Sequence, residues 1–208
     1  DFNESNEFFY LCYYKYTQLV DLFMEKKEKD INDYIMQAGN DAIKKAAEDD
    51  KTEVIYYLLS KCTCIKNSLF SNIKGLTRIA IPPSITSIEE NSFGECSRMK
   101  LISIPSSVTS IGGYAFAKCH SLKELTIPSH LSKINAFTFC NCVGLKKVSI
   151  PSSVTFILGF AFESCQSVEH ISVFTNVNKM ASNVFDCCVS LLYIDIPPLK
   201  QIPSRAYM

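Results

Sequence analysis

The sequence predicts an α+β repeat solenoid, in which a short N-terminal block of helices precedes stacked units that share a parallel β-sheet. Two observations predict this fold. Apolar residues and cysteines recur with a period of 23 residues from about residue 65 onward. Residues 1–60 carry 13 acidic and 7 basic side chains, whereas residues 61–208 carry 8 acidic and 14 basic. We therefore expect two units, residues 1–62 and residues 63–208, in a chain whose 47% apolar content is enough to bury a core.

Two short helices are expected first, within residues 39–61. The polar break Asp49-Asp50-Lys51 suits a tight turn between two runs of helical spacing, which are Ile43, Ala46 and Ala47, then Val54, Ile55, Leu58 and Leu59. This segment is similar to an ankyrin repeat, although Asp41-Ala42-Ile43-Lys44 stands where that family has Thr-Pro-Leu-His. Residues 17–26 resemble residues 52–61 and precede them by 35 positions. We therefore expect about two ankyrin-like repeats in residues 1–62, which either cap the solenoid or end a longer ankyrin array.

The repeating unit follows, and five columns of residues return in it every 23 positions without an insertion. The columns are isoleucine before proline (Ile81, Ile104, Ile127, Ile150), an apolar residue (Ile88, Ile111, Ile134, Ile157, Met180), phenylalanine (Phe93, Phe116, Phe139, Phe162, Phe185), cysteine (Cys96, Cys119, Cys142, Cys165, Cys188) and a residue ahead of the strand (Leu76, Met99, Leu122, Leu145, Val168, Leu191). Residues 65–73 fit a degenerate capping unit. Residues 202–207 fit a last unit that stops midway, as in a longer array that has been truncated.

Each unit is expected to begin with a short strand. Leu122, Leu125 and Ile127 alternate with Glu124 and Thr126, so the first three point inward and the other two outward. Proline then ends the strand, because it has no N–H to donate to a ladder. A single unit cannot bury its apolar face alone, but stacked neighbours can.

At this point the sequence resembles a known family. Residues 104–119, which read Ile-Pro-Ser-Ser-Val-Thr-Ser-Ile-Gly-Gly-Tyr-Ala-Phe-Ala-Lys-Cys, look like a BspA-type leucine-rich repeat. The resemblance covers residues 65–207, and leucine-rich repeats of about 20–29 residues accommodate this period. It implies a parallel-sheet solenoid used for protein contact, often in surface proteins of bacteria and parasitic protists, and it implies no catalysis.

The cysteine column is expected to be structural. Rungs of a parallel sheet lie about 4.8 Å apart, wider than the roughly 3.8 Å between the Cβ atoms of a disulfide. Zinc needs a tetrahedral cluster of ligands rather than a line. The other cysteines lack Cys-x-x-Cys spacing, and His120, His130 and His170 lie in no metal motif. We expect no catalytic residue, no metal and no cofactor, and a Cys–His dyad is the alternative that stays open.

The outward strand positions are the candidate partner-binding surface, because side chains there are free to vary while the core is fixed. This surface comprises Arg78, Lys100, Leu101, Lys123, Glu124, Lys146, Lys147, His170, Tyr193 and Asp195. Three of its lysines should stack one rung apart, which indicates either a solubilising stripe or a site for an acidic protein partner. Nucleic acid is not expected, because the formal net charge is +0.

The favoured interpretation is a non-catalytic scaffold that binds a protein partner rather than a small-molecule substrate. Free thiols and ankyrin-like repeats favour the cytoplasm. A cell-surface adhesin or antigen is the alternative that the family resemblance permits, and an enzyme with a cysteine nucleophile is the third. No run of about 18 apolar residues occurs, so no membrane span is expected in this chain.

Overall fold

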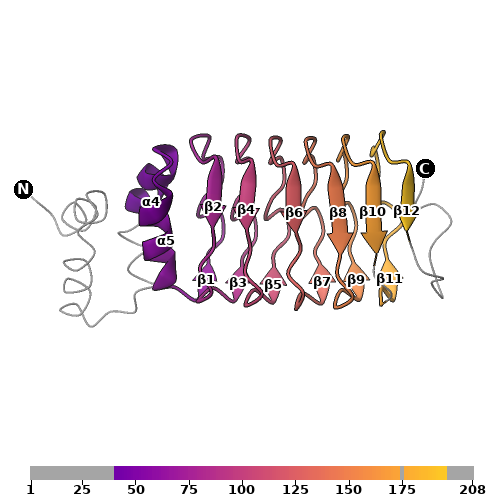
Figure 1. Ribbon diagram of the computed structural model, residues 1–208, viewed down its shortest axis with the longest axis horizontal. Coiled ribbons are helices and arrows are strands. Elements are labelled where there is room, and N and C mark those ends of the chain that lie inside the picture. Colours follow the sequence, from indigo (N-terminus) through magenta and orange to yellow (C-terminus); the bar gives the residue numbers. More distant parts are fainter. Residues whose placement is uncertain (1–39, 174–175, 196–208) are drawn as a thin grey trace, which may run out of the picture.

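The computed structural model describes residues 40–173 and 176–195 (Figure 1). Two helices, α4 (Asn40–Glu48) and α5 (Thr52–Ser60), lie at one end of a stack of rungs. The turn between them contains Asp50, whose φ of 53° is left-handed. The predicted helix pair, with its break at residues 49–51, is therefore confirmed, whereas residues 17–26 and 202–207 lie outside the described residues.

Each rung contributes one strand to a row that runs the length of the stack. This front row consists of β2 (Arg78–Ala80), β4 (Leu101–Ser103), β6 (Glu124–Thr126), β8 (Lys147–Ile150), β10 (His170–Val173) and β12 (Tyr193–Asp195). All pairings in it are parallel, with partners 23 residues apart, such as Arg78 with Leu101 and Lys147 with His170. The parallel solenoid predicted from the period is confirmed, and the inward and outward positions of the third rung are as expected.

A second row of two-residue strands was not foreseen. It consists of β1 (Cys64–Ile65), β3 (Ser87–Ile88), β5 (Ser110–Ile111), β7 (Lys133–Ile134), β9 (Phe156–Ile157) and β11 (Lys179–Met180). Figure 1 shows this row running beside the front row along the same stack. The second residue of each strand points inward, as the column of Ile88, Ile111 and their equivalents indicated, but two residues are too few to show a strand period in a sequence.

The interior is one continuous apolar cluster that extends from Ile43 of α4 to Phe185. A ladder of phenylalanine rings runs through it, with centroids 5.0 to 5.6 Å apart from Phe70 to Phe185. Since the ladder begins in the degenerate unit of residues 65–73, that unit is a true rung of the stack.

The helix pair is fastened to the first rung of the front row. The carboxylate of Asp50 accepts hydrogen bonds from the backbone N–H of Thr77 at 3.1 Å and from its hydroxyl at 2.7 Å. On the next rung, the equivalent N–H, that of Lys100, donates to the carbonyl oxygen of Thr77. The Asp50 carboxylate thus accepts the hydrogen bond that a backbone carbonyl of the preceding rung accepts elsewhere in the stack. Gly75 allows the close approach, because a Cβ there would collide with the backbone of Glu48.

Both rows are interrupted at the same place. In the front row, hydrogen bonds pair β2 with β4 and link β6, β8, β10 and β12 into one sheet, but they do not pair β4 with β6. The second row likewise has no pairing between β5 and β7. Near the break, the Asn135 side-chain amide donates to the carbonyl oxygen of Ile111 at 2.6 Å. On other rungs a backbone N–H does this, for example from Gly112 to Ile88.

Candidate functional site

Nine of the ten predicted surface residues lie along the front row with side chains that are exposed or half-buried, and the backbone of the tenth, Asp195, belongs to the last strand of this row. The side chains of Arg78, Lys100, Leu101, Lys123, Glu124, Lys146, Lys147 and Tyr193 are exposed, His170 is half-buried, and Asp195 is paired in register with Ser172. The fold therefore brings residues from six strands onto one face. It does not gather them at one point, since the ends of the face are five rungs apart, or about 24 Å at a rung spacing near 4.8 Å.

Lys100, Lys123 and Lys146 occupy the position just before the strand on three successive rungs, and we call them the lysine stripe. The backbone N–H of Lys146 donates to the carbonyl oxygen of Lys123 at 3.0 Å, which keeps these two in register. None of these three lysines forms an ion pair with an acidic side chain of the described residues. The stripe ends at Glu169, where the sign of the charge reverses.

Beyond the stripe, the face becomes mixed. Glu124 and Lys147 are register partners on β6 and β8, where opposite charges on adjacent strands are favourable. The rings of His170 and Tyr193 lie 4.4 Å apart between centroids. The Nδ1 atom of His170 is buried and finds no hydrogen-bond partner among the described residues.

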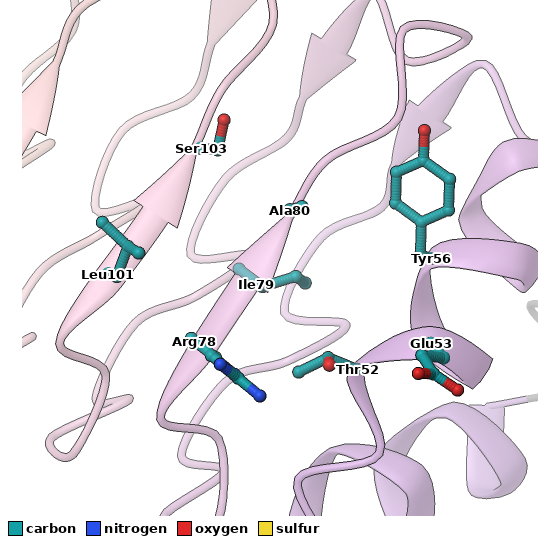
Figure 2. A pocket seen from close by; sticks show the side chains of 8 residues that line it. All are labelled: Thr52, Glu53, Tyr56, Arg78, Ile79, Ala80, Leu101 and Ser103. Atoms are coloured by element: carbon teal, nitrogen blue, oxygen red, sulfur yellow. The ribbon is translucent and has the colours of Figure 1, made fainter.

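A groove of about 400 Å³ opens at the N-terminal end of the face, between α5 and the strands β2 and β4 (Figure 2). Its lining comprises Thr52, Glu53 and Tyr56 from the helix, and Arg78, Ile79, Ala80, Leu101 and Ser103 from the strands. We call it the cap groove. Sequence reasoning found Arg78 and Leu101 but missed the helix residues, because the repeat period carries no information about how a preceding helix packs.

The cysteine column is bound into the backbone of the stack. Each thiol donates to the carbonyl oxygen of the phenylalanine 26 residues earlier, at 2.9 Å for Cys96 and 3.1 Å for Cys142. Burial raises the pKa of the Cys96 thiol to about 12 and also raises the pKa of Cys142. Such thiols stay protonated near neutral pH, so they are poor nucleophiles and poor metal ligands.

Two groups outside the column, Cys140 and His130, make contacts of their own. The thiol of Cys140 contacts Glu163 at 3.2 Å, and its pKa is raised to about 11, mainly by burial and also by that hydrogen bond. His130 Nδ1 lies 3.0 Å from the carbonyl oxygen of Ser106. In residues 40–173 and 176–195, no group of three or more His, Cys, Asp or Glu side chains could hold a metal ion.

An aromatic stack on the turns after the second row also escaped the sequence reasoning. The rings of Tyr114, Phe137 and Phe160 lie 4.6 and 4.9 Å apart between centroids. All three residues are left-handed, with φ between 56° and 60°, a conformation that side chains of this size rarely adopt. Their 23-residue spacing was the available signal.

No helix in the described part of the chain is long and apolar enough to cross a membrane.

Comparison with known proteins gives a consistent match. A family model described as the BspA type leucine rich repeat region fits the chain in six copies, over residues 51–157 and 86–208. A leucine rich cell surface protein from Faecalibacterium prausnitzii A2-165 is 30% identical with a TM-score of 0.57, covering 60% of this chain and 33% of that one. A leucine-rich repeat protein from Bacteroides ovatus ATCC 8483 is 32% identical with a TM-score of 0.57, covering 63% and 34%.

A leucine-rich repeat protein of T. pallidum shares the fold at 24% identity, with a TM-score of 0.54 over 62% of this chain and 71% of that one. The chain spans about a third of the length of the Faecalibacterium and Bacteroides proteins. A search of curated proteins found no significant match. The predicted ankyrin-like repeats gain no support, because the family match begins at residue 51 and the described residues hold only one helix pair.

Proposed function

The chain belongs to the BspA-type leucine-rich repeat family, and on that premise we propose that it is a non-catalytic scaffold whose front row binds a protein partner. The lysine stripe carries this proposal. It is a row of exposed ammonium groups on three successive rungs, of which the last two belong to one parallel ladder, and no described residue forms an ion pair with any of them. Like charges one rung apart destabilise a sheet slightly, so a partner that supplies carboxylates would relieve an existing repulsion.

The expected partner is an acidic protein surface. Complementary charge accelerates association and selects against basic surfaces, more than it adds to affinity. The other charged groups of the face, such as Arg78 and Lys147, extend the positive potential, whereas Glu124 and Glu169 limit it. The contact should therefore centre on the second to fourth full rungs.

We propose the helix pair as the N-terminal cap of this scaffold, with residues 1–62 as a separate unit from residues 63–208. The Asp50–Thr77 contact and the close approach at Gly75 support the capping role. The ankyrin-like character of residues 1–62 remains a proposal that rests on the sequence pattern alone.

A triple substitution tests the binding proposal. Lys100→Glu, Lys123→Glu and Lys146→Glu together should leave folding intact, because all three side chains are exposed. The matched control is Lys74→Glu, Lys133→Glu and Lys179→Glu, three exposed lysines outside the front row. Pull-down with mass spectrometry should find a partner that the wild type and the control retain and the stripe variant loses. A partner retained equally by all three proteins would refute a role for the stripe.

A cell-surface adhesin is the second candidate, and one observation favours it. The similar Faecalibacterium structure is described as a leucine rich cell surface protein. The same pull-down separates the two candidates when it is run against both cytosolic extract and extracellular-matrix proteins. Capture from the matrix set alone would favour the adhesin.

A further inference from the structure

The cap groove differs from the rest of the front row because a helix rises beside the sheet there. At β2 the helix α5 forms a wall beside the exposed face (Figure 2), whereas the described strands from β6 to β12 are bordered by one another. A segment of another protein placed over β2 would therefore be enclosed on one side by the helix and underneath by the sheet.

The groove combines exposed apolar surface with small residues. Leu101 is 57% exposed and Tyr56 is 43% exposed, although both are large hydrophobic side chains that favour burial. Ala80 and Ser103 also line the groove, and their small side chains leave it open. At about 400 Å³ the groove is near the lower end of the roughly 300–1,000 Å³ typical of ligand pockets. It therefore suits one or two residues of a partner rather than a folded surface.

The charges around the groove are unequally placed. Arg78 lies within it on β2, and Lys100, the first residue of the lysine stripe, directly precedes Leu101. Glu53 is on the opposite wall, in α5. An occupant whose acidic side points toward β4 and β6 would meet Arg78 and the stripe, and would keep its carboxylates away from Glu53.

We propose that the cap groove anchors one bulky apolar side chain of an extended segment of the partner, and that acidic residues following this anchor lie along the lysine stripe. This inference rests on the proposed function and specifies its partner. Lys146 is two rungs beyond Leu101, about 10 Å at a rung spacing near 4.8 Å. An extended chain advances at most about 3.3–3.6 Å per residue, so it needs about three residues to cover this distance, and the carboxylates should fall within about five residues of the anchor.

Selection of random dodecapeptides displayed on phage, against the immobilised full chain, tests this directly. The expected consensus is one leucine or aromatic residue followed, within about five positions, by at least two aspartates or glutamates. Failure to enrich any peptide, or a consensus without the apolar residue, would overturn the proposal. The most enriched peptide is then synthesised and its affinity measured by fluorescence polarisation.

Two substitutions and two matched controls locate the peptide. Leu101→Ser should weaken binding about tenfold or more, because the anchor loses apolar contact, and Arg78→Gln should weaken it less and chiefly at low salt. The control for the first is Val189→Ser, a residue 79% exposed outside the groove. The control for the second is Lys179→Gln, an exposed lysine in β11. Both controls should bind as the wild type does.

The outcomes separate this inference from the function on which it rests. If the triple lysine variant loses the peptide while Leu101→Ser and Arg78→Gln retain it, the front row binds acidic segments but the groove is no anchor. If Leu101→Ser loses the peptide and the lysine variant retains it, the apolar anchor stands alone and the acidic half of the proposal is wrong. Retention by every variant contradicts both.

Discussion

Replacing Phe139 with alanine should remove a large part of the stability of the stack. The ring of Phe139 is completely buried, and it lies between Phe116 at 5.5 Å and Phe162 at 5.2 Å, measured between centroids. Truncating a buried phenylalanine costs about 3–5 kcal/mol. We expect about 4 kcal/mol here, because each flanking ring is held by its own neighbour in the ladder and cannot move to fill the space.

Phe139→Leu separates the stacking contribution from simple packing. Leucine retains most of the side-chain volume but loses both ring–ring contacts, each worth about 0.5–1.5 kcal/mol. We therefore expect Phe139→Leu to cost about 1–3 kcal/mol, below the alanine variant. The difference between the two variants measures the cavity.

Urea unfolding followed by far-UV circular dichroism is the assay, since the chain has no tryptophan for fluorescence. Coincidence with a second probe, tyrosine fluorescence, should be checked, because repeat stacks can unfold in parts. A loss below about 2 kcal/mol for Phe139→Ala would refute the argument that the ladder resists collapse. Equal losses for alanine and leucine would instead show that ring stacking, rather than volume, dominates.

Three further predictions concern the contacts that hold the rungs together. Asp50→Ala should lower the free energy of unfolding by about 1–3 kcal/mol in the same urea assay, because the N–H of Thr77 loses a charged acceptor; an unchanged midpoint would contradict the capping role. Asn135→Ala should cost about 1–2 kcal/mol and speed amide exchange in β5 and β7, whereas unchanged exchange would show that its bond to Ile111 is dispensable. Iodoacetamide under native conditions should modify exposed Cys187 well before the four buried column cysteines, Cys96, Cys119, Cys142 and Cys165, whose thiol pKa values are raised by burial. Early alkylation of these four, detected by mass spectrometry, would contradict their burial.

Much of this architecture was predictable because a repeat converts a three-dimensional contact into a fixed sequence spacing. Phe139 and Cys142 recur at 23 residues, and both are fully buried against their equivalents on the next rung. The turn at Asp50 was predictable for a different reason, since charged residues interrupted two runs of helical period there. The outward position of Leu101 then followed from the alternation along its strand, whereas Lys100 lies just before the strand. That this face binds a partner stays a prediction.

The contacts that escaped prediction join different columns of the repeat, or positions outside the repeat. The hydrogen bond from the Cys142 thiol to the Phe116 carbonyl depends on how turns on adjacent rungs overlap, which residue types alone do not encode. Asn135 looks like any polar turn residue, yet its amide takes over a ladder bond where both rows are interrupted. The cap groove depends on how α5, which carries Tyr56, packs beside β2, and within the described residues this helix pair has no second copy from which to infer the packing.

The cap and the groove arise from the same physical requirement. The first strand of a parallel stack leaves one row of backbone groups unpaired, and natural proteins cover such an edge. Here α5 covers β2, Asp50 holds Thr77, and the helix that shields the edge also forms the wall of the groove. Stability and binding should therefore be coupled at this end of the molecule. Asp50→Ala should weaken both, whereas Leu101→Ser should weaken the selected peptide's binding and leave the unfolding midpoint unchanged. If Asp50→Ala destabilises the chain while peptide affinity stays at the wild-type value, the position of α5 beside the groove does not depend on the Asp50–Thr77 contact, and this coupling is wrong.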